Sequence, residues 1–150
     1  MTINIPRQLD YSVVIRTLGT SGEKYHSLLK SVKSQTVQPR EVVVVMARGY
    51  TLPPFHIENE RVVWTRKGMI NQRQVGFEES KSPYLLVLDD DISFENDFVE
   101  KMFRQMQSTG ADCIFPVTGF GGAKVGCKKH EASCWAQSVT RRAKTSIILE

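Results

Sequence analysis

The chain has 150 residues with 41% hydrophobic content, which suits one compact domain with a buried core and argues against two independent domains. Its formal net charge of +4 comes from the end of the chain, because residues 1–120 hold 14 basic and 14 acidic side chains whereas residues 121–150 hold 6 and 2. A body without net charge lacks the broad basic face that nucleic-acid binding needs, so we expect no nucleic-acid partner.

The first half of the chain alternates strand and helix patterns. Residues 11–18 (YSVVIRTL) contain a β-branched run that stops at Gly19, which predicts a strand followed by a loop. From Glu23 onward, apolar residues fall at the spacing of one buried helical face, at Tyr25, Leu28, Leu29 and Val32. Residues 41–46 (EVVVVM) read as a central parallel strand that is covered on both faces.

The second half continues this alternation. Strands are expected at residues 61–64, 84–88 and 112–117, and helices at residues 69–81 and from Phe98 to a stop at 108–110. This order predicts an α/β fold of three layers, α/β/α, with a mostly parallel sheet in a single domain of residues 1–150. Residues 119–150 are expected to form a basic tail, flexible in its Gly-rich first part.

The sequence shows no clear membrane span or secretory signal and no clear disulfide pattern. No apolar run approaches the roughly 18 to 20 residues that span a bilayer, and the N-terminus lacks the build of a secretory signal. We therefore expect a cytoplasmic protein whose basic tail can contact an anionic ligand, the inner membrane surface or another part of a longer chain. Cys113, Cys127 and Cys134 fit neither a disulfide framework nor a paired zinc motif, so we expect reduced thiols.

The most informative feature is the aspartate triplet Asp89, Asp90 and Asp91, which directly follows the apolar residues 84–88. Ligands of parallel sheets bind at the carboxyl ends of the strands. Three adjacent carboxylates repel one another, and a divalent cation neutralises them while leaving positions for phosphate oxygens. The alternative, an acidic loop that caps the next helix, requires only one acid. The pattern therefore favours a metal site.

Several motifs resemble glycosyltransferase family 2, which has the GT-A fold, over about residues 11–118. In that family a first strand ending in Pro-Thr or Arg-Thr precedes a helix that closes with Ser-x-x-x-Gln-Thr. Residues 14–17 (VIRT) and 31–36 (SVKSQT) stand in those places. A later family element, Ala-Arg-Asn-x-Gly before an apolar strand and an Asp-x-Asp motif, resembles residues 72–76 (QRQVG), with Gln74 in place of Asn, followed by residues 84–91.

The resemblance implies a Rossmann-like GT-A core over residues 11–118 that binds a nucleotide-diphosphate sugar together with Mg or Mn. Asp91 would coordinate the metal, with Asp89 as a further metal-site carboxylate. Asp89 and Asp90 would share contacts to the donor ribose and to the water shell of the metal.

The resemblance also implies donor contacts from other elements. Arg73 would face the donor, although it could equally be a solvated helix residue, and Arg66 and Lys67 could reach the same phosphates. Thr17 and Gly19 would lie along the nucleotide base, although Thr17 could also be a simple strand-end hydroxyl. We expect Gly76 to permit close packing of a helix and to contact no ligand.

Two departures limit this assignment. The second strand ends in residues 46–49 (MARG), where the family places an acidic element that reads the base, so the base is not identified. The chain also stops before the acceptor half of the family, which implies a C-terminally truncated protein. His130 and Glu131 are the nearby candidates for a general base, and both fit solvated loop residues better, so no catalytic base is assigned.

The resemblance implies a metal-dependent, inverting glycosyltransferase of polysaccharide biosynthesis, with a saccharide or lipid-linked glycan as acceptor. The alternative is a non-catalytic nucleotide-sugar-binding fragment without the acceptor half. A metal-dependent phosphatase or nucleotidyltransferase is disfavoured because no P-loop-type phosphate loop follows the first strand. An incomplete sheet with an open edge would also allow a homo-oligomer.

Overall fold

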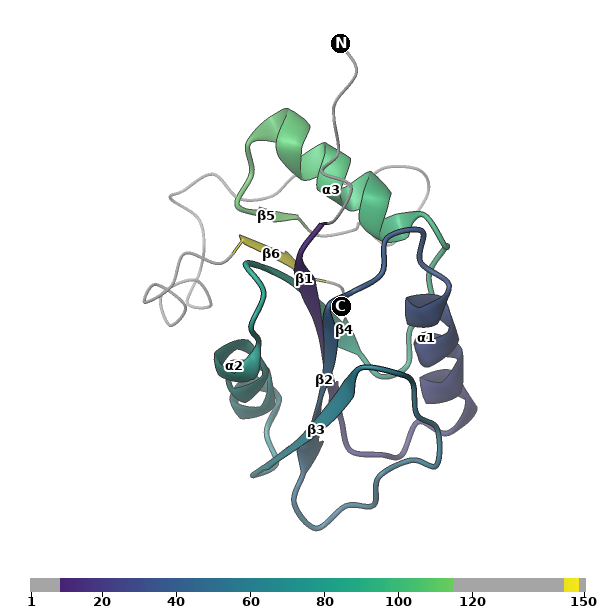
Figure 1. Ribbon diagram of the computed structural model, residues 1–150. Helices are drawn as coiled ribbons and strands as arrows, with labels where there is room; N and C mark the ends of the chain where they lie inside the picture. The colour runs from purple at the N-terminus through teal and green to yellow at the C-terminus, as the bar shows by residue number, and fades with distance from the viewer. Residues whose placement is uncertain (1–8, 115–144, 149–150) are drawn as a thin grey trace.

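The computed structural model describes residues 9–114 and 145–148 (Figure 1). Within them, one sheet has the strand order β3-β2-β1-β4-β6-β5, and all its pairings are parallel. The strands are β1 (Tyr11–Thr17), β2 (Glu41–Ala47), β3 (Glu60–Thr65), β4 (Tyr84–Asp89), β5 (Cys113–Ile114) and β6 (Thr145–Ile148). Parallel pairing requires long connections, which here are α1, the irregular residues 48–59 between β2 and β3, and α2.

The helices cover both faces of this sheet (Figure 1). They are α1 (Glu23–Lys33), α2 (Met69–Glu79) and α3 (Phe98–Thr109). The apolar faces of α1 and α3 pack on one side of the strands, whereas α2 packs on the other. This arrangement confirms the predicted three-layer α/β/α fold. No described helix is long and apolar enough to cross a membrane.

The core explains why the strands are apolar without interruption. Every residue of β2 is buried, because its alternate side chains point to the two helical layers. In β1, Val13 and Ile15 face α1 and α3, and Val14 faces α2. The two faces of the sheet therefore belong to two separate apolar clusters.

Helix α2 approaches the sheet most closely at a glycine, and Val75 and Phe77 pack beside it. Its buried residues are Gln72, Arg73 and Gly76. A Cβ atom on Gly76 would lie 2.3 Å from Cγ1 of Val14, closer than packed carbon atoms approach. The expected role of Gly76 in close helix packing is confirmed.

The predicted boundaries agree with the structure to within one residue for most elements, and three points differ. Helix α2 ends at Glu79 and not at residue 81, because Ser80 is extended and the Lys81 amide donates to the Glu41 side chain. Only residues 113–114 of the predicted strand 112–117 are described as β5, and residues 115–144 of the predicted strand and tail lie outside the described part. Residues 145–148 form β6 between β4 and β5, which the sequence pattern did not indicate.

Candidate functional site

The predicted site residues gather where the order of the strands reverses. The chain runs outward from β1 to β2 and β3, then crosses back to β4 on the other side of β1. Ligands of open parallel sheets commonly bind at the carboxyl ends of the strands where the strand order reverses, which here are the ends of β1 and β4. Thr17 ends β1 and Asp89 ends β4, which places both at this topological switch point.

Thr17 joins the two strands through its hydroxyl group. The Thr17 side chain is buried, and its Oγ1 donates to Oδ2 of Asp90 at 2.5 Å. The same oxygen accepts from the Gly19 backbone N–H at 2.8 Å. The structure thus brings together Thr17, Gly19 and Asp90, three residues that the sequence singled out separately.

Asp89 is held by two arginines on the α2 side of the sheet. Its Oδ1 lies 2.8 Å from Nε of Arg16 and 3.2 Å from Nη2 of Arg73. Arg16 and Asp89 are partners in the register of β1 and β4, so their side chains share one face of the sheet. The Arg73 side chain is 5% exposed and that of Asp89 is 18% exposed. Arg73 therefore reaches the predicted edge, where its described contact is a carboxylate.

Asp91 differs from the other two aspartates because it is exposed. It lines a hollow of about 230 Å³ together with Glu23, Lys24 and Ser27 of α1. Within the described part of the chain, its carboxylate has neither a hydrogen bond nor an ion pair. Among the described residues, Asp91 is thus the member of the triplet whose carboxylate has no hydrogen-bond or ion-pair partner.

The three carboxylates diverge, because Asp89 points to the arginines, Asp90 to Thr17 and Asp91 to α1. Among residues 9–114 and 145–148, no group of three or more His, Cys, Asp or Glu side chains is arranged to hold a metal ion. A site built only from protein ligands is therefore not formed by these residues. Mg²⁺ in nucleotide sites commonly uses one or two carboxylates and completes its coordination with substrate phosphates and water. An exposed Asp91 fits that mode.

Gln72 links the ends of β1 and β2 to α2, a role that sequence reasoning missed. Its side chain is buried, and Nε2 donates to the carbonyls of Thr17 at 3.0 Å and Val45 at 2.9 Å. Its Oε1 accepts from the Gly68 N–H at 3.4 Å. The available signal was its position one helical turn before Gly76, which places a polar side chain on the buried face of α2.

The loop after β1 packs closely against the connection between β2 and β3. Gly19 has a φ of +76°, and a Cβ atom there would lie 2.1 Å from the Thr51 carbonyl oxygen. Glycine is needed both for this conformation and for the close approach of the two loops. The carboxyl edge therefore has a tightly fixed backbone beside Thr17.

The other basic candidates lie further out on this edge. Arg66 and Lys67 are exposed, and Nζ of Lys67 donates to the Tyr50 hydroxyl at 2.7 Å. Arg48 is exposed beyond the end of β2. These side chains are free to approach an anionic ligand from solvent. His130 and Glu131, the general-base candidates, lie outside the described residues.

Tyr25 of α1 is buried and is close enough to Asp90 to be affected by its charge. Burial raises the pKa of the Tyr25 hydroxyl, and the negative charges of Glu60 and Asp90 raise it further. The hydroxyl is therefore protonated at neutral pH. Within the described residues it has no hydrogen-bond partner.

Comparison with known proteins adds a family to this geometry. The sequence model of glycosyl transferase family 2 matches residues 56–145, which include the aspartate triplet and α2. A search of curated proteins found no match.

Solved structures share the fold. S. aureus TarS superposes with a TM-score of 0.58 at 18% identity, over 78% of this chain and 23% of the TarS chain. TarS 1-349 in complex with UDP-GlcNAc gives 0.59 at 19% identity, over 79% and 37% of the two chains, and the complex with UDP gives 0.57 at 18%, over 79% and 38%. The protein thus spans well under half the length of these structures, and the likeness agrees with the GT-A fold.

Proposed function

Because the chain belongs to glycosyl transferase family 2, we propose that it forms the donor-binding part of an enzyme that transfers a sugar from a nucleotide-diphosphate donor to an acceptor hydroxyl. The observation that carries the proposal is the cluster at the β1/β4 switch point, where Asp90 is tied to Thr17 and Asp91 stands exposed beside it. Structures of the same fold were solved with UDP and UDP-GlcNAc, which supports a nucleotide sugar as the ligand class.

We propose Asp91 as the metal ligand, with Mg or Mn as the ion. Its carboxylate is exposed and unpaired within the described residues, so it can coordinate without breaking an existing contact. The ion, when bound, would stabilise the negative charge that develops on the departing nucleoside diphosphate. Asp90 is already oriented by Thr17 and would contact the donor ribose or the water shell of the metal.

Asp89 and its two arginines would form the adjoining wall of the donor site. Both arginines contact Oδ1 of Asp89, whereas Oδ2 has one contact at 3.5 Å, with Arg73. Oδ2 is therefore the oxygen that can support the metal site. Guanidinium groups form strong, charge-assisted hydrogen bonds with phosphate oxygens, so this wall suits a diphosphate. Thr17 and Gly19 would lie along the nucleotide base.

The transfer itself is proposed to invert the anomeric carbon, with a saccharide or lipid-linked glycan as acceptor. The described residues around the switch point supply groups for the donor and no assigned base for the acceptor. The alternative is a nucleotide-sugar-binding fragment without turnover. Donor binding without sugar transfer to any acceptor would distinguish it.

The test is calorimetric titration with UDP, GDP, dTDP and CDP, with and without Mn²⁺. We expect Mn²⁺-dependent binding of one nucleotide, weakened by about a hundredfold in Asp91→Ala, as for the loss of a metal ligand. The free energy of unfolding should stay within about 0.5 kcal/mol, because Asp91 is exposed. Asp112→Ala is the matched control, since Asp112 is an exposed aspartate away from β4. Absence of binding for all four nucleotides would contradict the donor site.

A further inference from the structure

A second hollow, of about 400 Å³, lies between α1 and the β2–β3 connection. Its α1 side carries His26, Lys30 and Lys33, and its other side carries Phe55 and His56. None of these residues contributes to the cluster at the β1/β4 switch point. The volume lies within the range of small-ligand sites, which is about 300 to 1,000 Å³.

The lining of this hollow is basic. It includes two lysines and two histidines and no acidic residue. Lys30 and Lys33 are exposed, and within the described residues neither forms an ion pair. Lysines near the end of α1 also favour the helix dipole, but that effect does not account for the histidine across the hollow. Residues 1–120 have no net charge, so this concentration of cations is local.

The walls of the hollow are fixed and partly apolar. The rings of His26 and Phe55 stack with centroids 4.2 Å apart and an interplanar angle of 4°, which holds the β2–β3 connection against α1. Nδ1 of His56 lies 3.0 Å from the Glu60 carboxylate, which orients that ring from the opposite side. Leu29 and Ile57 add apolar surface. A ligand would thus meet an apolar wall with the ammonium groups of Lys30 and Lys33 on its α1 side.

We propose that this hollow binds a small organic phosphate at a site separate from the donor site. Lys30 and Lys33 would bind the phosphate through charge-assisted hydrogen bonds. The carbon skeleton would pack against the apolar wall at Phe55 and Ile57. The proposal does not depend on the proposed function, because it uses different residues.

The test is titration with glucose 6-phosphate, with glucose as the uncharged comparison, by calorimetry and by the shifts of the histidine ring protons. Wild-type protein should bind glucose 6-phosphate and not glucose. Lys30→Gln/Lys33→Gln should weaken binding by about tenfold or more, because two charge-assisted contacts are lost. Lys81→Gln/Lys101→Gln is the matched control, because it removes the same charge from exposed lysines outside the hollow and should retain the affinity.

Four outcomes would overturn the proposal. The first is no binding of glucose 6-phosphate, or equal binding of glucose. The second is an equal loss in both double variants, which would mean a response to net charge alone. The third is displacement of glucose 6-phosphate by UDP with Mn²⁺, which would assign it to the donor site. The last is binding of phosphatidylglycerol vesicles without glucose 6-phosphate, which would indicate a lipid surface instead.

Discussion

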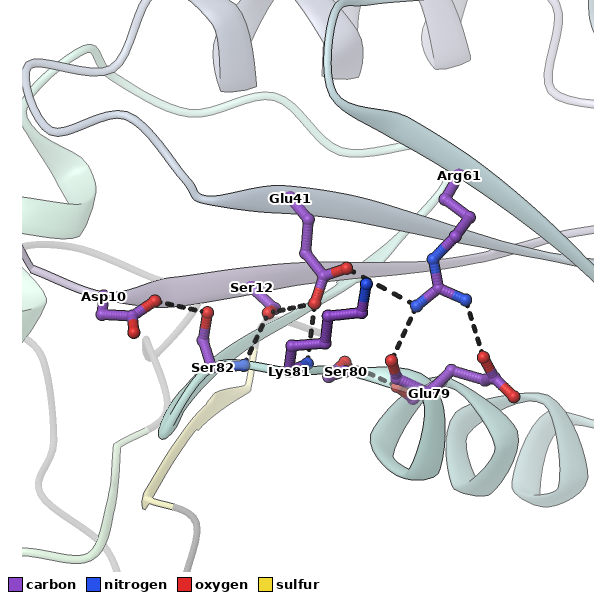
Figure 2. Close-up of polar contacts among 9 residues, drawn as sticks. Asp10, Ser12, Glu41, Arg61, Glu79, Ser80, Lys81 and Ser82 are labelled. Atoms are coloured by element: carbon purple, nitrogen blue, oxygen red, sulfur yellow. Dashed lines mark hydrogen bonds and ion pairs between the residues drawn. The ribbon is translucent and has the colours of Figure 1, made fainter.

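The carboxylates at the two edges of the sheet differ in whether other groups of the protein contact them. At the amino edge, Glu41 accepts hydrogen bonds from the Lys81 amide at 2.7 Å and the Ser12 hydroxyl at 2.9 Å, and lies 3.5 Å from Arg61 (Figure 2). At the carboxyl edge, Asp91 has no such partner among the described residues. At the amino edge, the chain itself supplies hydrogen-bond donors to the Glu41 carboxylate. At the carboxyl edge, the Asp91 carboxylate stays available for a ligand.

The amino-edge network extends beyond Glu41 (Figure 2). Arg61 also binds the Glu79 carboxylate at 2.6 Å, and the Ser82 hydroxyl donates to Asp10 at 2.6 Å. Burial raises the pKa of Glu41, but the hydrogen bonds from Lys81 and Ser12 and the charge of Arg61 outweigh it and hold the pKa below its ordinary value. Glu41 is therefore ionised and fully engaged in joining β2 to its neighbours.

This difference distinguishes a carboxylate that stabilises the fold from one that is available to bind a ligand. A buried carboxylate is tolerated when the chain itself supplies its donors, as at Glu41. Carboxylates at the strand ends of the other edge range from paired, at Asp89, to exposed and unpaired, at Asp91. The predictions below test whether the first edge governs stability and the second governs binding.

The largest effect is expected for Glu41→Ala. The change removes three hydrogen-bond contacts and leaves Arg61 and the Lys81 amide without their carboxylate, which should cost about 2 to 4 kcal/mol in the free energy of unfolding. Chemical denaturation measures this cost. Nucleotide affinity of the folded variant should be unchanged, because Glu41 lies at the opposite edge. If Glu41→Ala kept the wild-type stability and lost nucleotide binding, the amino edge would serve binding, and the assignment of the two edges would be wrong.

The pH dependence of the same network has a definite sign. Because the pKa of Glu41 is lowered on folding, its contribution to stability is present above the ordinary value of 4.5 and is lost as the pH falls through the lower folded value. The difference in unfolding free energy between wild type and Glu41→Gln should therefore be constant near neutral pH and shrink below about pH 4.5. Glu95→Gln, at an exposed glutamate, is the control. An increase of this difference in unfolding free energy below about pH 4.5 would contradict the prediction.

Helix α2 supports both edges, because Arg73 contacts Asp89 at the carboxyl edge and Glu79 contacts Arg61 at the amino edge. In Gly76→Ala the new Cβ would lie 2.3 Å from Val14 Cγ1, so α2 must move away from the sheet, at a cost of about 1 to 3 kcal/mol. We expect both a lower free energy of unfolding and weaker nucleotide binding. The double variant Val14→Ala/Gly76→Ala makes room for the methyl group and should recover part of the binding. A double variant that binds no better than Gly76→Ala would contradict this account.

The sequence predicted the fold because the apolar runs of β2 and β4 and the spacing of Tyr25 to Val32 are local signals. It also indicated the candidate site, since Thr17 and the aspartates lie at the ends of predicted strands. The partners of Asp89 could not be predicted, because Arg16 meets it only through the β1–β4 register. Strand β6 was missed for the same reason, since its place between β4 and β5 depends on pairing far along the chain.

Among the buried positions Glu41, Gly76 and Thr17, the smallest change in stability is expected at Thr17, which links β1 to the end of β4. Thr17→Val keeps the buried shape but removes the bond to Asp90 and the acceptor for the Gly19 N–H, which should lower the free energy of unfolding by about 1 kcal/mol. Asp90 would no longer be oriented, so nucleotide affinity should fall more than in Thr17→Ser, which retains a hydroxyl. Denaturation and titration of both variants measure this. Equal nucleotide affinity in the two variants would mean that the Thr17–Asp90 bond stabilises the sheet and does not orient the donor site.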